Sequence, residues 1–170
     1  MVGLAMCKEL GPVMMAILIS GRIGSAITAE IGSMKVYQEI DALRTMNINP
    51  IRFLVMPRLL AIMIALPLLV VFSTLIGWMG GAMVATFNPA VNLSYAGYIN
   101  SLGDMVDGFD VLNGLIKSFV FAVIIGVVSC HQGLETIGGP RGVGRSVTKS
   151  VVNSIVLILM FDYFLTRIMI

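Results

Sequence analysis

Four long apolar segments alternate with polar stretches along the chain. They cover residues 10–29, 59–87, 111–130 and 151–170. A helix needs roughly 20 apolar residues to cross the hydrocarbon core of a membrane, and each segment is long enough. The pattern therefore predicts an all-α integral membrane fold with four transmembrane helices, organised as a single domain over residues 1–170.

Small residues recur at every fourth position in the first apolar segment. Such residues allow another helix backbone to approach closely. We therefore expect this segment to pack inside the bundle rather than against lipid. The small residues form two stripes, Ser20-Gly24-Thr28-Gly32 and Gly21-Ser25-Ala29.

Residues 30–58 form the longest hydrophilic stretch. Apolar residues recur there at spacings of mostly three or four, which predicts one short amphipathic helix from Glu30 to Met46. Asn47 loosens this helix, and Pro50 prevents its continuation. The acids on its polar side suit an anionic membrane surface poorly, so we expect the helix to meet a soluble partner. Its charged residues are Glu30, Lys35, Glu39, Asp41 and Arg44.

Composition supports the membrane class. Hydrophobic residues make up 58% of the 170 and charged residues 12%, whereas a soluble domain carries about a quarter charged residues. The net charge of +2 says little, because the placement of charge matters more in a membrane protein. Cys7 and Cys130 fall in or beside apolar segments, so we expect buried free thiols rather than a disulfide.

The basic residues of the polar stretches indicate an orientation. Residues 30–58 carry four Lys or Arg, residues 88–110 carry none, and residues 131–149 carry three. By the positive-inside rule, the first and third stretches are cytoplasmic and the second is periplasmic. Both termini then lie outside. Because no cleavable signal peptide is recognisable, we expect at least one further span ahead of this chain.

Six ionisable residues lie within or beside the apolar segments, where a charge costs roughly 2.5–3.5 kcal/mol at mid-depth. On this orientation five of them fall toward the outer half, which predicts a polar patch there. Structural ion pairs or snorkelling would explain the patch, and so would contact with the headgroup of an amphiphilic substrate. Arg22, nearer the cytoplasm, would pair with Glu30 or snorkel. The outer five are Lys8, Glu9, Lys117, Asp162 and Arg167.

The sequence offers little support for enzymatic or metal chemistry. His131 is the only histidine and has no ligand-forming residues at suitable spacing, so we expect no metal site. Residues 139–146 resemble a phosphate-binding P-loop, but Arg145 replaces the lysine and no strand precedes them. We expect a flexible cytoplasmic turn instead. No residues are spaced as a nucleophilic catalytic set, so we do not expect an enzyme.

Several short runs, in order along the chain, together resemble one family. It is the MlaE permease family, the membrane subunits of Mla- and Mce-type ABC transporters, which move phospholipids or other hydrophobic molecules. The resemblance covers essentially the whole chain. The runs are ELGP at residues 9–12, SAITAEIG at 25–32, QEIDALRTM at 38–46, LIKSFVF at 115–121 and GRSVT at 144–148.

The resemblance implies a homodimeric permease of the bacterial inner membrane. It would exchange phospholipid with a hexameric periplasmic MCE-domain protein and serve outer-membrane lipid asymmetry. ATP and Mg would be bound by a separate ATPase subunit, to which a small STAS-domain protein would bind, and this chain would hold no cofactor and no nucleic acid. The family also implies an N-terminal interfacial helix and a further span ahead of the part seen here.

Two sets of residues match family positions. The helix from Glu30 to Met46 resembles the coupling helix that docks on the ATPase, which would give Glu30, Lys35, Glu39, Asp41 and Arg44 that role. A lipid cavity between the two copies would bind substrate near Lys8, Glu9, Lys117 and Asp162. The alternatives are an ion-coupled secondary carrier or channel, with Lys117 and Asp162 as relays, and a structural scaffold.

Overall fold

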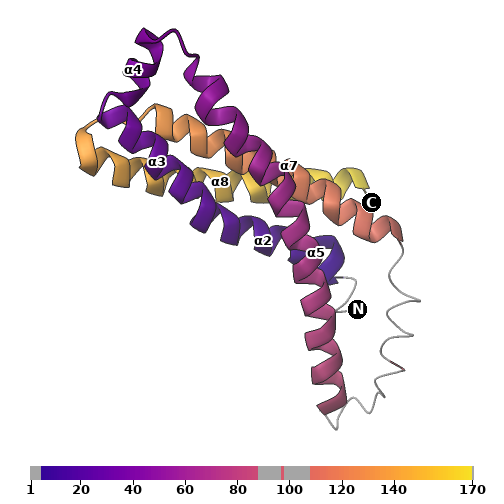
Figure 1. Ribbon diagram of the computed structural model, residues 1–170. Coiled ribbons are helices and arrows are strands. Elements are labelled where there is room, and N and C mark those ends of the chain that lie inside the picture. Colours follow the sequence, from indigo (N-terminus) through magenta and orange to yellow (C-terminus); the bar gives the residue numbers. More distant parts are fainter. Residues whose placement is uncertain (1–4, 88–96, 98–107, 170) are drawn as a thin grey trace.

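Helices make up almost all of the computed structural model, which describes residues 5–87, 97 and 108–169. Within these ranges the chain forms no strand. Four helical runs are long and apolar enough to cross a membrane (Figure 1). The predicted all-α membrane fold is thus confirmed. The runs are Met6–Val36, Ile51–Val84, Gly108–Leu134 and Gly139–Ile168.

Two of the four runs extend beyond their predicted segments at both ends, and the runs over Ile51–Val84 and Gly139–Ile168 begin earlier than predicted. A run such as Gly139–Ile168 has 30 residues and is about 45 Å long, whereas the hydrocarbon core is about 30 Å thick. Helices of this length are therefore long enough to extend past the hydrocarbon core. The elements are η1 (Met6–Leu10), α2 (Gly11–Ile19), η2 (Ser20–Gly24), α3 (Ser25–Val36), α4 (Glu39–Thr45), η3 (Ile51–Val55), α5 (Met56–Phe87), α7 (Gly108–Leu134) and α8 (Gly139–Met169), with η denoting a π-helical turn.

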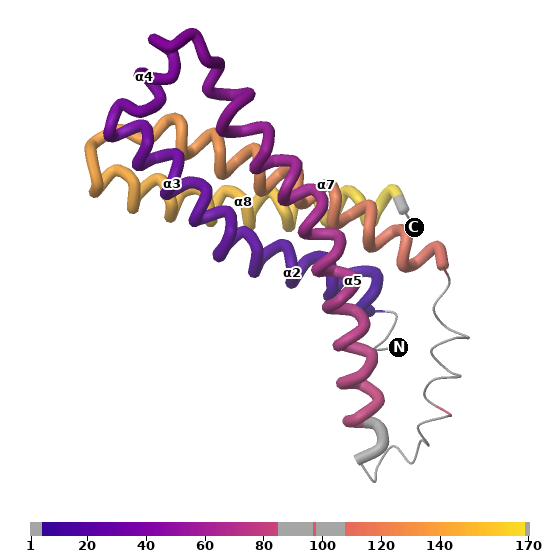
Figure 2. Tube along the Cα trace, in the orientation of Figure 1, coloured from indigo at the N-terminus to yellow at the C-terminus, as the bar shows by residue number. Residues whose placement is uncertain are grey.

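Helix α7 packs against α3, α5 and α8, and α3 also packs against α8. Helix α5 crosses the other helices, and its last turns extend away from them (Figure 2). The core is apolar, and each of these four helices supplies at least one fully buried side chain. They include Ile31, Leu66, Phe121, Ile125 and Ile158.

The first small-residue stripe lies at the contact of α3 with α7 and α8. All four of its residues are buried. A β-carbon on Gly24 would lie 2.9 Å from Ser129 Oγ, and Thr28 Oγ1 lies 3.0 Å from the Ser129 carbonyl oxygen and 2.8 Å from Ser150 Oγ. The prediction that the first span packs inside the bundle is confirmed for the face that carries this stripe. The second stripe, residues 21, 25 and 29, is exposed or half-buried.

The prediction of a single helix from Glu30 to Met46 is wrong. The helix breaks after Val36, and Gln38 adopts a left-handed conformation with φ +60°. The first half continues the first spanning helix, because Ile31 and Gly32 are buried. The break turns α4 so that Ile40 is buried as well, and this packing outweighs the local helical pattern.

The end of α4 follows the sequence only in part. Helix α4 ends at Thr45, and Asn47 has φ +61°, which agrees with the predicted loosening at this residue. Pro50 begins the following helical run instead of only ending the previous one. Proline suits a first helical turn, where its missing N–H has no intrahelical partner to lose.

The predicted glycine-rich loop over residues 131–149 is also wrong. Helix α7 continues to Leu134 and α8 begins at Gly139, so only residues 135–138 lie between them. Gly138 and Gly139 reverse the chain with φ +96° and +72°. Pro140 then stands in the first turn of α8, a position that it favours. The periplasmic stretch predicted over residues 88–110 lies almost wholly outside the described residues.

Candidate functional site

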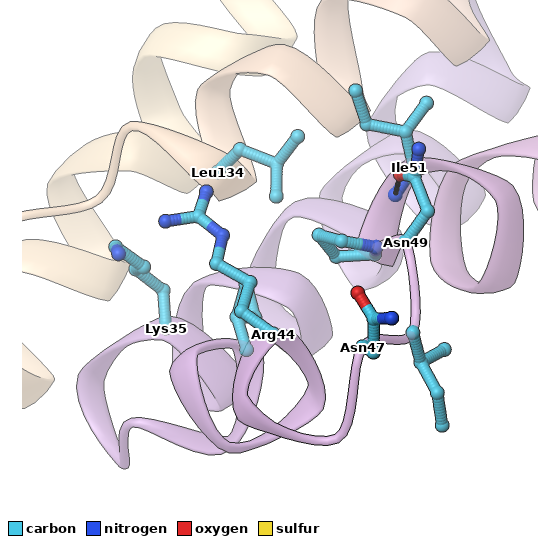
Figure 3. A pocket seen from close by; sticks show the side chains of 9 residues that line it. Lys35, Arg44, Asn47, Asn49, Ile51 and Leu134 are labelled. Carbon is cyan, nitrogen blue, oxygen red and sulfur yellow. Dashed lines mark hydrogen bonds between the residues drawn. The ribbon is translucent and has the colours of Figure 1, made fainter.

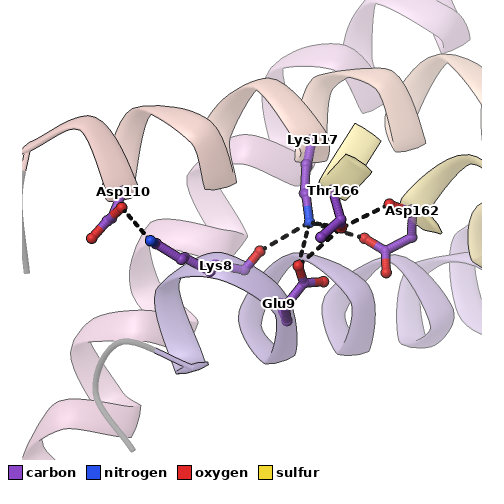
Figure 4. A network of polar contacts seen from close by, with 6 residues as sticks. All are labelled: Lys8, Glu9, Asp110, Lys117, Asp162 and Thr166. Atoms are coloured by element: carbon purple, nitrogen blue, oxygen red, sulfur yellow. Dashed lines mark hydrogen bonds and ion pairs between the residues drawn. The ribbon is translucent and has the colours of Figure 1, made fainter. Parts of the chain in front are cut away.

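A polar cluster lies where η1, α7 and α8 meet (Figure 4). Asp110 and Lys117 are seven residues apart on α7, and Asp162 and Thr166 are four apart on α8, so each pair shares one helix face. The two faces point toward η1, which contributes two adjacent charged residues. The polar cluster consists of Lys8, Glu9, Asp110, Lys117, Asp162 and Thr166.

Lys117 stands at the centre of the polar cluster, and its side chain is only 4% exposed. Its Nζ donates to Glu9 Oε1 and Thr166 Oγ1, both at 2.7 Å, and to Asp162 Oδ1 at 3.2 Å. The Lys8 carbonyl oxygen lies 3.3 Å away. An ammonium group has three N–H donors. Lys117 therefore has no donor left for a ligand in this arrangement.

Lys8 and Glu9 form the accessible part of the polar cluster. Lys8 Nζ lies 2.8 Å from Asp110 Oδ1, and its side chain is 44% exposed. The Glu9 side chain is 40% exposed. A reachable cation next to a reachable anion is the arrangement that complements a zwitterion. Two lysines and three carboxylates give the whole cluster a formal charge of −1.

The structure brings together all four residues predicted to bind substrate, Lys8, Glu9, Lys117 and Asp162. Arg167 is exposed on α8 and makes no ion pair with any described residue. Sequence reasoning missed Asp110 and Thr166. Their spacing from Lys117 and Asp162 was a usable signal, because residues four or seven apart share a helix face.

A second candidate region is the α4 connection, residues 37–50, which joins the first two spanning helices. Ile40 is buried, and Leu43 packs against the core. The opposite side of α4 is exposed at Glu39, Asp41 and Ala42. Helix α4 is therefore anchored on the bundle by one face and presents a polar face outward.

The residues predicted to couple to an ATPase divide into three groups. Asp41 Oδ1 lies 3.5 Å from Lys35 Nζ and 3.4 Å from Arg44 Nη1. Glu39 is exposed and makes no ion pair within the described part of the chain.

Glu30 forms the third group by itself. It pairs with Arg58 at 2.6 Å and not with Arg22, so it joins α3 to α5 beside the α4 connection.

Comparison with known proteins decides the family. The family model described as Permease MlaE matches residues 1–168. The chain belongs to the MlaE permease family. MlaE relatives include a probable ABC transporter permease protein of Rickettsia typhi, 40% identical over 98% of this chain. Another probable ABC transporter permease protein, from Synechocystis, is 40% identical over 98% of the chain.

A plant MlaE relative is also similar. The chloroplastic protein TRIGALACTOSYLDIACYLGLYCEROL 1 of Arabidopsis thaliana is 38% identical over 96% of this chain. The matches cover 63% of the Rickettsia protein, 62% of the Synechocystis protein and 46% of the Arabidopsis protein. The chain thus spans just under two thirds of the length of its bacterial relatives.

Proposed function

We propose that this chain is the permease subunit of an ABC transporter that moves phospholipids or related hydrophobic lipids. The transfer would take place between the bacterial inner membrane and a periplasmic MCE-domain carrier, and would serve outer-membrane lipid asymmetry. The chain itself would be non-enzymatic, and a separate ATPase subunit would bind ATP and Mg. The name of the plant relative, which is that of a diacylglycerol lipid, supports a lipid substrate.

The observation that carries this proposal is the attachment of α4. This short helix presents a polar face and is joined at both ends to helices that cross the membrane. Its buried Ile40 fixes it to the bundle core, and the Glu30–Arg58 ion pair joins the two flanking helices beside it. A force applied to α4 therefore reaches two spanning helices through rigid contacts.

The proposed mechanism follows from this attachment. ATP closes the two ATPase subunits, and α4 moves with the subunit on which it docks. The spanning helices then tilt as near-rigid bodies. A lipid cavity between two copies of the permease narrows or opens, and a lipid passes to the hexameric MCE protein. A STAS-domain protein would act on the ATPase rather than on this chain.

The polar cluster is the proposed headgroup contact. Lys8 would meet the phosphate and Glu9 a cationic headgroup, because these two side chains are accessible. Lys117 and Asp162 would hold η1, α7 and α8 together around Lys8 and Glu9. Lys117 would not contact the substrate, because its N–H groups donate to residues of the polar cluster. This role differs from the direct substrate contact expected for Lys117 from the family resemblance.

A charge reversal on α4 tests the proposal. Glu39→Lys changes an exposed acid that makes no ion pair with any described residue, so folding should be preserved. In proteoliposomes that hold the whole transporter, we expect ATP hydrolysis to continue while lipid transfer per ATP falls at least about tenfold, because a reversed charge opposes docking at a charged interface. Alanine variants at Asp41 and Arg44 extend the series.

The matched control is Glu135→Lys, which reverses an exposed acid in the connection between α7 and α8. We expect this variant to transfer lipid at the wild-type ATP cost. Normal coupling in Glu39→Lys would show that α4 does not transmit the force. Lipid transfer that follows a proton gradient and needs no ATPase would instead favour the ion-coupled carrier.

A further inference from the structure

A pocket of about 470 Å³ opens between α4, the end of α3 and α7. Its volume lies within the range of small-molecule sites. Lys35 and Arg44 extend the same way beside Leu134, and Asn47 and Asn49 lie across the pocket (Figure 3). The family resemblance assigns Lys35 and Arg44 to ATPase coupling, but neither it nor the proposed transport mechanism gives this pocket a ligand.

The pocket surface is cationic. Among the described residues that line it, Lys35 and Arg44 are basic and none is acidic. Asp41 approaches both from outside the lining, at 3.5 and 3.4 Å. These contacts are long for charged hydrogen bonds, and a guanidinium and an ammonium together offer eight donors. Most of these donors remain open, and the local charge of the three groups is +1.

The pocket lies where the chain leaves and re-enters the membrane. One spanning run ends at Val36 and the next begins at Ile51, so the pocket is at the level of the lipid headgroups. Ile48 and Ile51 line it and are exposed, as is the neighbouring Phe53. Exposed apolar side chains at this level favour contact with lipid acyl chains.

We propose that this pocket binds the headgroup of an anionic phospholipid from the adjoining leaflet. Lys35 and Arg44 bind the phosphate, Asn47 and Asn49 offer amide groups to the rest of the headgroup, and the exposed isoleucines contact the acyl chains. The site is at the opposite end of α7 from the polar cluster. It is therefore separate from the proposed lipid path, and its occupancy does not depend on transport.

The bound headgroup would take over the role of Asp41 as counter-ion of Lys35 and Arg44. It would contact α3, α4 and α7 together and brace the α4 connection across the break at Gln38. Asp41 then acts as a built-in competitor for the two cations. The alternative is that an acidic side chain of a partner protein occupies the same pocket. The experiment must distinguish this occupant from a phospholipid headgroup.

Lipid binding to the purified full chain in detergent tests the proposal without any transport assay. The probes are short-chain phosphatidylglycerol, short-chain phosphatidylcholine and inorganic phosphate, with binding followed by native mass spectrometry. We expect phosphatidylglycerol to bind at least about tenfold more tightly than the other two, because only it combines net negative charge with acyl chains. Equal binding of inorganic phosphate would overturn the assignment to a lipid.

Substitutions in the pocket sharpen the test. In K35Q/R44Q we expect phosphatidylglycerol binding to weaken about fivefold for each cation removed. The charge-conserving K35R/R44K should retain binding, and Asp41→Asn should tighten it because the competitor is lost. This gain in affinity keeps the proposal testable even where the double glutamine variant folds poorly.

The matched control is R141Q/R145Q, which removes two exposed cations from the same end of the bundle. We expect its phosphatidylglycerol affinity to stay within about twofold of wild type, since a surface substitution outside the site acts only through weak long-range charge. A loss as large as that of K35Q/R44Q would indicate general attraction and overturn the pocket. Wild-type binding in K35Q/R44Q would also overturn the proposed lipid site. It would indicate that Lys35 and Arg44 bind an acidic side chain of a partner protein instead.

Discussion

Lys117 is the residue on which the polar cluster depends. It carries a charge inside a spanning helix, where an unpaired cation is costly. Two carboxylates and a hydroxyl within 3.2 Å compensate that cost. The same contacts join three segments that are far apart in the sequence. Lys117 therefore contributes to the packing of the bundle as well as to its electrostatics.

Lys117→Met should be strongly destabilising. The substitution keeps an apolar stem of similar length but leaves Glu9 and Asp162 together without a cation. Breaking a buried ion pair in this way costs about 3 kcal/mol, and the partial exposure of Glu9 reduces that figure. Chemical unfolding in detergent measures the change.

The triple variant E9Q/K117M/D162N should recover most of the loss, because it removes the two unpaired charges. Arg167→Gln is the control, since Arg167 is exposed and makes no ion pair with described residues; it should change stability by less than about 0.5 kcal/mol. Wild-type stability in Lys117→Met would mean that the ion pairs do not hold the helices together.

The contact of α3 with α7 is one of the close helix pairings that glycine allows among the described residues. Gly133 on α7 faces α3 so closely that a β-carbon there would lie 2.8 Å from Ile31 Cβ and 3.3 Å from the Thr28 carbonyl oxygen. Neither atom can rotate away, because one is a branched β-carbon and the other belongs to the backbone. The two helices must separate to admit even a methyl group.

Gly133→Ala should therefore destabilise the protein by about 1–3 kcal/mol, despite the better helix propensity of alanine. Gly144→Ala on α8 is the matched control, because a β-carbon there meets nothing within 4 Å. It should leave stability unchanged or raise it by up to about 1 kcal/mol. Thermal unfolding of both variants in the same detergent compares them, and equal midpoints would contradict the close packing.

At the scale of elements, the sequence predicts the spanning helices better than their connections. Apolar length alone locates all four spans, and the spacing of Gly24 and Thr28 identifies the packed face of the first. The break at Gln38 has no local signal, since glutamine rarely adopts φ > 0 and tertiary packing of Ile40 imposes it. At Gly138 the sequence predicts a long loop where the chain makes a short turn, because glycine and proline occur in both.

At the scale of the whole molecule, the two ends of the bundle differ in charge. The α4 connection and the turn between α7 and α8 lie at one end, and the polar cluster lies at the other. The chain is a multi-pass membrane protein of the MlaE family. Its basic connections support the proposal that the α4 end is cytoplasmic.

Single cysteines test this orientation in a background with Cys7 and Cys130 replaced by alanine. Thr45→Cys and Ile137→Cys lie at exposed positions of the two connections, so a membrane-impermeant maleimide should label them only after permeabilisation. Asn92→Cys, in the stretch predicted to be periplasmic, should react in intact spheroplasts. The opposite labelling pattern would reverse the orientation and exclude docking of a cytoplasmic ATPase on α4.

The position of Lys117 also has a consequence for the insertion of the protein into the membrane during synthesis. During synthesis Glu9 has already emerged when Lys117 enters the bilayer, whereas Asp162 follows 45 residues later. Helix α7 is thus inserted with one of the two carboxylate partners of Lys117 available, and the other arrives with α8. The ion pair between Lys117 and Asp162 therefore favours packing of α8 against α7 as the nascent chain is inserted. The order of the helices along the sequence is then the order in which the buried charge of Lys117 is neutralised.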